Sequence, residues 1–531
     1  MKRTTTILSL LLIVLLSLSA CGSAGVTVAE SESGISETSQ TESAETVSTA
    51  SSSEMFTDRD MEIGYDEETS AGITLSGDSA SSDSDAVQIS GSTITITDEG
   101  TYILSGTLND GMIVVSAEDT DKIQLVLDNV EITSSTSAAI YVLEADKVFI
   151  TTASGSENAL ANGGEYVAID DNNIDAVIFS KSDLTLNGAG TLNINAAAGH
   201  GVVSKDDLVL TSGTYEITAA SQGLSGKDSV RIANGTYTIT SGKDGIHAEN
   251  TDDPSLGFLY IAGGTFIITA DGDGMSASNY LQIEDGSYTI TTGEGSASVT
   301  MTTDTMGFGQ RGGFQDQATT TTTTTEEDSV SQKGIKADGV LTITGGTFVT
   351  DTVDDSIHSN SDVLIAGGEF ELSTGDDAIH SDGAVNIQNG SFLIAYCYEG
   401  IEGLSITIDD GTFDITSQDD GLNAAGGTDS SGFGGRAPEQ EQFSDGTDVF
   451  ITINGGNVVV VASGDCLDSN GDLTINDGTL DLTCNGNGDT AIDCDGTYTN
   501  NGGDVTTNDG SENNPGQMGG LGGMGQGRGG H

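Results

Sequence analysis

The chain has 531 residues and a formal charge of −67 at pH 7, from 15 basic and 82 acidic side chains. A surface of this sign should repel nucleic acids and anionic lipid headgroups and attract cations. Gly is abundant (74 residues), Pro is scarce (3) and Trp is absent, which favours short strands joined by tight turns over helices.

The N-terminus has the features of a bacterial lipoprotein signal peptide, residues 1–20. Lys2 and Arg3 precede an apolar run over 7–18, which is short for a membrane span. The run ends in the sequence LSAC, which resembles the lipoprotein box, so we expect Cys21 to be acylated. Several acyl chains on one residue hold a protein stably on a membrane. The alternative is an ordinary signal peptide with an incidental Cys; both place the mature protein outside the cytoplasm.

Two segments follow before the regular part of the chain begins. Residues 21–60 are mostly Ser, Thr, Glu and Ala, a composition that cannot bury a core, and they are predicted to form a disordered tether. Residues 61–170 alternate Thr, Ile and Val without a fixed period. We interpret them as an N-terminal β cap and the first coils of a solenoid, because solenoids need atypical end units.

Residues 171–508 contain a repeat with a period near 22 residues, interrupted by insertions near 293–332 and 426–445. Each unit has an alternating run, a turn rich in Asp, Asn and Gly, and a second run of the form Gly-Thr-Phe/Tyr-x-Ile-Thr. This pattern predicts an all-β fold, a parallel β-helix with about 22 residues per coil, in which coils stack at roughly 4.8 Å. Residues 509–531 are predicted to be a disordered Gly-rich tail. The aligned apolar residues are Ile178, Val202, Leu224, Ile246, Met275, Ile335, Ile357, Ile379, Ile401, Leu422, Leu467 and Ile492.

An aromatic residue occupies one repeat position in many units. Stacked aromatics form either a sugar-binding platform outside the coil or a ladder inside it. The alternation with Thr and Glu favours the inside. The residues are Tyr215, Tyr237, Phe266, Tyr288, Phe348, Phe370, Phe392 and Phe413.

Acidic residues also recur at fixed positions, just before the aligned apolar residue. Stacking would set their carboxylates about one strand spacing apart, where two charges repel by about 0.9 kcal/mol even in water. Hard oxygen ligands at turns suit Ca²⁺, so we expect calcium along this edge; the alternative is that each Asp caps its own turn. The acids are Asp244, Asp273, Asp355, Asp377, Glu399, Asp420 and Asp465, with Asp354, Asp376 and Asp419 one position earlier.

The position just after the aligned residue is polar and is predicted to point outward. Lys336, His358, His380 and Glu402 lie there and form a candidate sugar-contact row; the alternative is a solvated strand face. Apart from Cys21, the chain has an even number of cysteines, which could form disulfides in an oxidising compartment, with the pairing left open. They are Cys397, Cys466, Cys484 and Cys494.

The block GTYILSGTLNDGMIVVSAEDTDKIQLVLDNVEITSSTSAAIYVLEADKVFIT and repeats such as GDDAIHSDGAVNIQNGSF resemble the carbohydrate-binding domain family of polysaccharide-lyase-like β-helices, over roughly residues 73–508. The resemblance implies a right-handed β-helix, calcium held by turn aspartates, and binding to cellulose-like and pectin-like polysaccharides without demonstrated cleavage. The first coils depart from the pattern, with Ala176, His200 and Gln222 where acids would stand. The family's ligands carry over to Asp354, Asp355, Asp376, Asp377, Asp419 and Asp420.

We therefore expect a monomeric, lipid-anchored surface protein that binds plant cell-wall polysaccharide without cleaving it. Its membrane contact would be the lipid alone, and it would not bind nucleic acid. One alternative is a calcium-dependent, pectate-type polysaccharide lyase, in which Lys333 or Lys336 would be the base. The other is an adhesin or structural stalk with no defined glycan.

Overall fold

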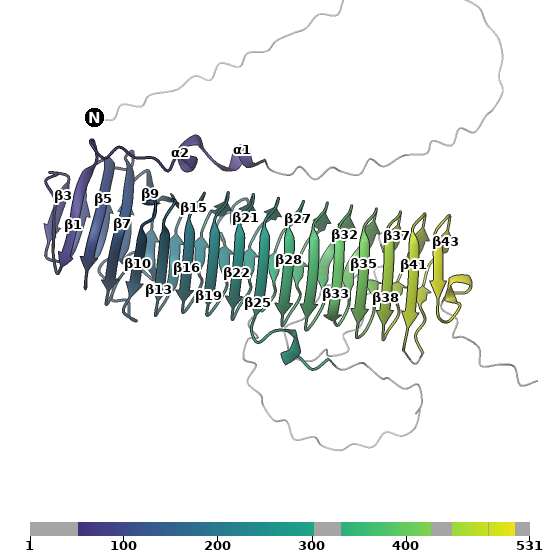
Figure 1. Ribbon diagram of the computed structural model, residues 1–531. Helices are drawn as coiled ribbons and strands as arrows, with labels where there is room; N and C mark the ends of the chain where they lie inside the picture. The colour runs from purple at the N-terminus through teal and green to yellow at the C-terminus, as the bar shows by residue number, and fades with distance from the viewer. Residues whose placement is uncertain (1–50, 302–330, 426–448, 487, 516–531) are drawn as a thin grey trace, which may run out of the picture. The chain divides into compact units, whose positions relative to one another are not determined.

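The aligned apolar residues lie directly above one another in consecutive coils. Parallel strand pairing joins each to the next without a break, from Ile178 to Ile492, and all are buried. We number the coils 1 to 12 by these residues. The computed structural model describes residues 51–301, 331–425, 449–486 and 488–515, and the predicted parallel β-helix is confirmed (Figure 1).

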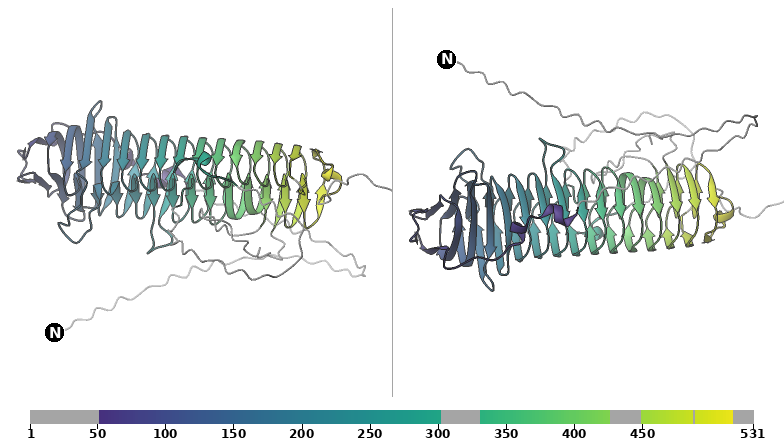
Figure 2. Two further views of the ribbon diagram at one scale, coloured as in Figure 1. Left: turned by 90° about the horizontal axis from the view of Figure 1, so that it is seen from below. Right: turned by 90° about the horizontal axis from the view of Figure 1, so that it is seen from above.

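Each coil contributes strands to three faces of the helix, and Figure 2 shows the stacked strands from below and from above. The first face carries the aligned apolar residues. Its strands are β4 (Thr93–Ile96), β6 (Met112–Ser116), β8 (Ile140–Glu144), β11 (Ala176–Ser180), β14 (His200–Ser204), β17 (Leu224–Gly226), β20 (Ile246–Ala248), β23 (Met275–Ala277), β26 (Ile335–Ala337), β29 (Ile357–Ser359), β32 (Ile379–Ile387), β34 (Ile401–Ile408), β36 (Leu422–Ala424), β39 (Leu467–Ser469) and β42 (Ile492–Cys494).

The second face follows the first in each coil, and β32 and β34 run through both. Its other strands are β9 (Lys147–Thr152), β12 (Asp183–Gly188), β15 (Asp207–Leu210), β18 (Ser229–Ile232), β21 (Phe258–Ile261), β24 (Leu281–Ile283), β27 (Leu341–Ile343), β30 (Val363–Ile365), β37 (Phe450–Ile453), β40 (Asp472–Ile475) and β43 (Tyr498–Asn500).

The third face carries the aromatic position. Its strands are β10 (Glu157–Asn162), β13 (Thr191–Ala196), β16 (Thr214–Ala219), β19 (Thr236–Ser241), β22 (Thr265–Ala270), β25 (Ser287–Thr292), β28 (Thr347–Thr352), β31 (Glu369–Thr374), β33 (Ser391–Cys397), β35 (Thr412–Ser417), β38 (Asn457–Ala462), β41 (Thr479–Cys484) and β44 (Asp504–Thr507).

The N-terminal end continues the stack with longer, less regular coils. Strands β5 (Gly100–Leu108) and β7 (Lys122–Ser134) turn the corner from the second face to the third, and β1 (Ala71–Gly77) pairs with β5. Two antiparallel pairs, made by β2 (Ala80–Ser81) with β1 and by β3 (Val87–Ser90) with β4, end the stack. Antiparallel ends fit the predicted cap, because they interrupt the repeating parallel edge.

The aromatic residues form a ladder inside the coil, as predicted. Neighbouring ring centroids are 4.6–5.2 Å apart and the rings are nearly parallel. The glycine two residues earlier makes room for each ring. At Gly390, where φ is 149°, an added Cβ would lie 2.7 Å from the ring of Phe392, which explains the Gly-Thr/Ser-Phe/Tyr motif.

Part of the segment predicted to be a tether is ordered. The described residues 51–60 carry helix α1 (Ser52–Met55) and most of α2 (Asp58–Met61), so the prediction of disorder is wrong there. Asp60 explains the difference, because it is buried and anchors α2 to the second face. Its Oδ1 lies 2.7 Å from Lys147 Nζ and accepts a 2.6 Å hydrogen bond from Thr185. The predicted signal peptide, Cys21 and residues 21–50 lie outside the described residues.

The C-terminal end also differs from the prediction. The short helix η2 (Ser511–Asn513) follows β44 and packs against coil 12. Asp509 Oδ2 accepts a hydrogen bond from Ala491 N at 2.9 Å, and Ser511 Oγ accepts one from Ile492 N at 3.1 Å. Residues 509–515 are therefore a cap rather than part of the tail, which from 516 on lies outside the described residues.

The predicted insertions are described only in part. Residues 293–301, with the short helix η1 (Ser296–Ser298), and 331–332 are described; 302–330 and 426–448 are not. The possible disulfides are absent, since Cys397, Cys466, Cys484 and Cys494 are all free. Within the described ranges, no helix has the length and apolar character needed to cross a membrane.

We expect Phe392→Ala to lower the free energy of unfolding by about 3–5 kcal/mol, because it leaves a cavity and breaks the ladder on both sides. Leu393→Ala is the matched control: it is adjacent on β33 but 43% exposed, whereas Phe392 is 2% exposed, and its effect should stay within about 0.5 kcal/mol. Denaturant unfolding of both variants measures this. Equal losses would contradict an inward ladder.

We expect Asp60 to make the docking of residues 51–63 depend on pH. Burial alone would raise the pKa of Asp60, but hydrogen bonds with Lys147 and Thr185 outweigh it and lower the pKa from 3.8 to about 2. The stabilisation that the ionised Asp60 gives to the docked segment is thus complete above pH 3.8 and is lost as the pH falls through about 2. Amide exchange in 51–63 should speed up over that interval. Asp60→Asn should speed it up more than about tenfold at pH 7; unchanged exchange would refute the anchor.

Candidate functional site

Two parallel rows of polar side chains run along the first face. The turn row lies two residues before the aligned apolar residue, and the strand row lies one residue after it. The predicted register of the strand row is confirmed by strand pairing. From coil 4 to coil 12 the turn row is Asp244, Asp273, Lys333, Asp355, Asp377, Glu399, Asp420, Asp465 and Thr490. The strand row is His247, Ser276, Lys336, His358, His380, Glu402, Asn423, Asp468 and Asp493.

The turn-row carboxylates cap the backbone of the following coil. Asp355 Oδ1 accepts a 3.1 Å hydrogen bond from Asp377 N, and Asp377 Oδ1 accepts one of the same length from Glu399 N. Asp244, Asp273, Asp420 and Asp465 make the same contact with the next turn-row amide. The acids therefore satisfy turn amides, as the capping alternative proposed, but one coil further on rather than in their own turn.

Histidines in the strand row pair with the aspartate of their own coil. His247, His358 and His380 place Nδ1 at 2.7, 2.8 and 3.3 Å from the aspartate three residues earlier. This explains why the chain repeats an Asp, two residues and then a His. The rings of His358 and His380 stack with their centroids 5.0 Å apart.

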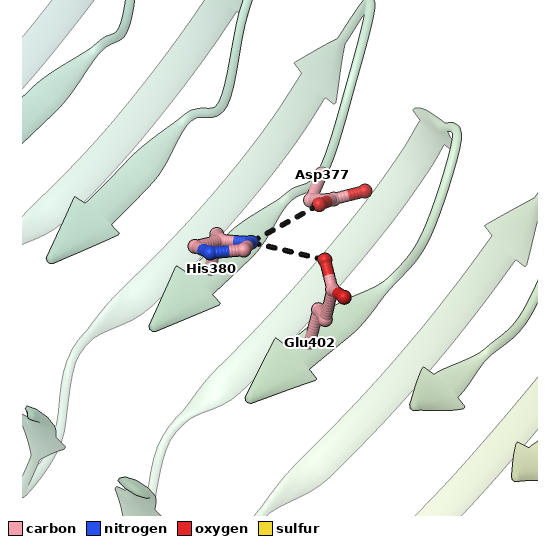
Figure 3. Close-up of side chains that lie close together, drawn as sticks. All are labelled: Asp377, His380 and Glu402. Atoms are coloured by element: carbon pink, nitrogen blue, oxygen red, sulfur yellow. Dashed lines mark hydrogen bonds and ion pairs between the residues drawn. The ribbon is translucent and has the colours of Figure 1, made fainter. Parts of the chain in front are cut away.

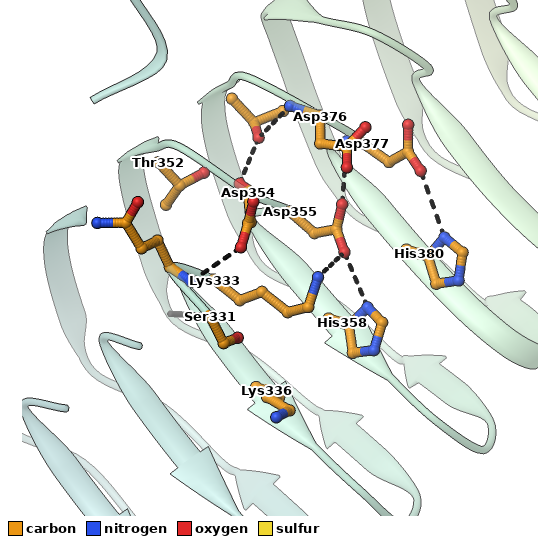
Figure 4. A network of polar contacts seen from close by, with 12 residues as sticks. Ser331, Lys333, Lys336, Thr352, Asp354, Asp355, His358, Asp376, Asp377 and His380 are labelled. Carbon is orange, nitrogen blue, oxygen red and sulfur yellow. Dashed lines mark hydrogen bonds and ion pairs between the residues drawn. The ribbon is translucent and has the colours of Figure 1, made fainter. Parts of the chain in front are cut away.

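Lys333 occupies the turn row itself and pairs with the next carboxylate. Its Nζ lies 2.7 Å from Asp355 Oδ2, which also faces His358 Nδ1 (Figure 4). Burial alone would raise the pKa of Asp355, but Lys333 and His358 hold it well below its usual range. In coils 6 and 7, basic side chains rather than a metal ion therefore balance the charge of Asp355.

The strand row is not the exposed face that the sequence predicted. His358 is 4% and His380 0% exposed, because their rings turn toward neighbouring carboxylates instead of solvent. Lys336 and Glu402 keep partly exposed side chains. The two histidines, at least, have no surface to offer a sugar. Lys333, a candidate lyase base, is also buried and engaged with Asp355.

Predicted calcium ligands in coils 5 to 7 already form hydrogen bonds and ion pairs within the protein. Asp354 Oδ2 accepts a 2.9 Å hydrogen bond from Gln332 N. Asp273 lies 4.0 Å from Lys336 Nζ and accepts a hydrogen bond from Ser331. The oxygens of Asp355, Asp376 and Asp377 do lie within 4.8 Å of one another, so the structure brings these predicted ligands together.

Coils 9 to 12 contain no described basic residue that could balance the charge of their acids. Among the described residues from 399 to 515 there is no Lys, Arg or His. Carboxylate oxygens of Asp465, Asp468 and Asp493 nevertheless lie within 4.8 Å of one another. Burial, Asp468 and Asp419 together raise the pKa of Asp420 to about 9. Burial and the charges of Asp468 and Asp493 raise that of Asp465 to about 7, although a hydrogen bond from the Thr490 amide opposes the shift.

An asparagine stands next to these acids in the strand row. Asn423 precedes Asp468 in the strand row, and its Oδ1 is buried without a hydrogen-bond partner, while its Nδ2 donates to Glu399 Oε2 at 2.9 Å. We call Asp420, Asn423, Asp465, Asp468 and Asp493 the C-terminal cluster. Asn423, Asp468 and Asp493 were not among the predicted metal ligands; the lack of basic residues among the described residues of these coils was the signal for them.

A third arrangement combines an imidazole with two carboxylates from successive coils. His380 Nδ1 lies 3.3 Å from Asp377 Oδ2 and 3.0 Å from Glu402 Oε2 (Figure 3). His380 and Glu402 are paired across β32 and β34. Burial alone would lower the pKa of His380, but Asp377, Asp382 and Glu402 raise it well above its ordinary value.

A family model for carbohydrate-binding domain-containing proteins matches residues 90–378 and 376–514. The chain belongs to this family. A carbohydrate-binding domain-containing protein of Acetivibrio thermocellus is 46% identical over 194 residues, which cover 36% of this chain and 68% of that protein. A solved structure, described as the polysaccharide lyase-like protein from C. thermocellum in a gadolinium derivative, is 37% identical and covers 42% of this chain and 92% of its own, with a TM-score of 0.41.

In this family member we expect Asp355→Asn to lower the free energy of unfolding by about 3–5 kcal/mol, because it leaves the buried Lys333 ammonium without its counter-charge. Adding Lys333→Met should recover more than about 1 kcal/mol of that loss, since contacting residues are coupled. Asp481→Asn, on the exposed side of β41, is the control. Denaturant unfolding measures all of them, and a double variant no better than Asp355→Asn would count against the pairing.

Proposed function

We propose that the protein is a non-catalytic polysaccharide-binding protein of the bacterial cell surface whose C-terminal cluster binds Ca²⁺. Membership of the carbohydrate-binding domain family supports the proposal that the protein binds a glycan. The single observation that carries the calcium site is the set of carboxylates in coils 10–12 with no described basic residue to balance them. Anchoring through Cys21 rests on the sequence of the first 21 residues alone.

The donor set of the C-terminal cluster suits calcium. Carboxylate and amide oxygens are the hard ligands that Ca²⁺ takes, and Asn423 Oδ1 is a buried oxygen that still lacks a partner. The raised pKa values of Asp420 and Asp465 reflect the same unbalanced charge. Calcium would be held by Asp420, Asp465 and Asp468, with Asn423 and Asp493, rather than by Asp355, which already pairs with Lys333.

The glycan has to be compatible with a chain of charge −67. A uronate polymer of the polygalacturonate type would be repelled unless a bound cation bridges the two sets of carboxylates. Asp465, Asp468 and Asp493 are only partly buried, so a cation held by them would be within reach of such a polymer. A neutral, cellulose-like glycan would not need this bridge.

The candidate lyase bases argue for binding without cleavage. A base must come within hydrogen-bond reach of the substrate proton. Lys333 is buried against Asp355, and Lys336 Nζ lies 4.0 Å from both Asp273 and Asp338. The absence of unsaturated uronide absorbance with polygalacturonate and calcium would be consistent with this proposal, and its appearance would refute it.

The test compares the wild type with Asp465→Asn/Asp468→Asn. Without calcium, the double variant should be as stable as the wild type or more stable, because it removes like-charge repulsion. Calcium should raise the melting temperature of the wild type, by the equivalent of about 2.7 kcal/mol at a hundredfold excess over Kd, and leave the variant unchanged. Asp481→Asn should respond like the wild type. An identical calcium response in the double variant would refute the site.

The same proteins test the glycan in co-sedimentation with insoluble polygalacturonate and with cellulose. Wild-type binding to polygalacturonate should disappear with a chelator while circular dichroism stays β-rich, and the double variant should not bind even with calcium. Binding to polygalacturonate that survives both treatments would remove calcium from recognition. Failure to bind either polymer would refute the proposed glycan class while leaving the calcium result intact.

A further inference from the structure

We propose that Asp377, His380 and Glu402 form a second metal site, separate from the C-terminal cluster, that binds a transition-metal ion such as Zn²⁺. The three donor atoms, Asp377 Oδ2, His380 Nδ1 and Glu402 Oε2, lie within 4.8 Å of one another (Figure 3). The site combines two consecutive coils: strand pairing sets Glu402 beside His380, and Asp377 comes from the turn just before His380 in the same coil.

The distances match the spacing of ligands around zinc. Ligand atoms at about 2.0–2.2 Å from a tetrahedral Zn²⁺ lie about 3.3 Å apart. The Nδ1 atom is 3.3 Å from Asp377 Oδ2 and 3.0 Å from Glu402 Oε2. A single N–H has one direction and is shared poorly between two carboxylates, whereas a metal ion in its place would contact all three atoms.

The surroundings fix the orientation of these donors. Asp377 Oδ1 accepts a hydrogen bond from Glu399 N, which directs Oδ2 toward His380. The far ring nitrogen of His380, Nε2, faces Asp382 Oδ1 at 3.5 Å. A carboxylate on the second nitrogen of a ligating histidine is the arrangement that sets its tautomer in zinc sites. Asp377 and His380 are both more than nine-tenths buried.

His358, one coil earlier, has similar neighbours to His380 but lacks the second carboxylate at its Nδ1 atom. It stacks on His380 and faces Asp355 in the same way. Asp355, however, already has the Lys333 ammonium 2.7 Å away, and the far nitrogen of His358 faces the neutral Asn360 at 2.7 Å. Lys333 lies one coil before Asp355 in the turn row, whereas the residue one coil before Asp377 in that row is Asp355 itself, so no lysine takes the equivalent place beside Asp377.

The chemistry of the donors selects the ion. Imidazole suits Zn²⁺ and other first-row ions, whereas Ca²⁺ takes oxygen ligands. His380 is the one described histidine beside which two carboxylate oxygens from different coils lie at its Nδ1. The site therefore differs in kind from the C-terminal cluster, which offers only oxygens.

The test is zinc binding by the purified, untagged protein in the Asp465→Asn/Asp468→Asn background, so that the C-terminal cluster does not contribute. After treatment with a chelator, the protein is dialysed against Zn²⁺ and its bound zinc is measured. We expect one zinc per chain that excess Ca²⁺ does not displace. His380→Gln and, separately, Glu402→Gln should weaken binding at least about tenfold, and the control His358→Gln should retain it.

Bound Co²⁺ provides a second measurement, because a tetrahedral site with imidazole gives visible absorption that His380→Gln should abolish. Circular dichroism identifies any variant that fails to fold, and Glu402→Gln then decides the matter. No zinc uptake, uptake that both variants retain, or displacement by calcium would each overturn the proposal. No glycan is present in the experiment, so its result is independent of the proposed function.

Discussion

The register between coils is the constraint on which the rest of the molecule depends. Parallel pairing makes the counterpart one coil away the nearest neighbour of most side chains, with aromatic rings 4.6–5.2 Å apart along the ladder. This geometry stabilises the structure where identical side chains attract one another and destabilises it where they repel one another. Phe and Tyr gain from it on the third face, whereas carboxylates on the first face lose from it.

The carboxylates remain because they satisfy backbone groups. Each capped amide belongs to a turn and would otherwise be a buried donor without a partner, which costs more than one hydrogen bond contributes. The chain then balances the charge in two ways along its length. Coils 4 to 8 place histidines and lysines between the acids, as Lys333 and His358 do around Asp355. Coils 9 to 12 place none among their described residues.

Periodicity in the sequence predicted whatever depends on the register alone. Alignment on Ile178 to Ile492 was enough to predict the strand row, the aromatic ladder and the stacked acids. It could not predict where side chains turn. Strand alternation predicts that outward-pointing side chains are exposed to solvent, but His380 is enclosed by Asp377 from its own turn and Glu402 from the next coil. Composition failed for residues 51–60 for a similar reason: a few specific contacts, such as the Asp60–Lys147 ion pair and the packing of the Phe56 ring on Tyr260, hold a segment that has few apolar residues.

The uneven charge balance also predicts uneven stability along the coil. A solenoid's stability is approximately a sum of terms within and between adjacent repeats, so a set of acids with no basic residue among its described neighbours weakens the interfaces where it lies and not those further away. Coils 1 to 3 carry Ala176, His200 and Gln222 in the turn row and have no such penalty, and coils 6 and 7 contain the Lys333–Asp355 pair. Without a divalent cation the C-terminal coils should therefore open before the others, which links the stability of that end to the same ions that we propose for glycan binding.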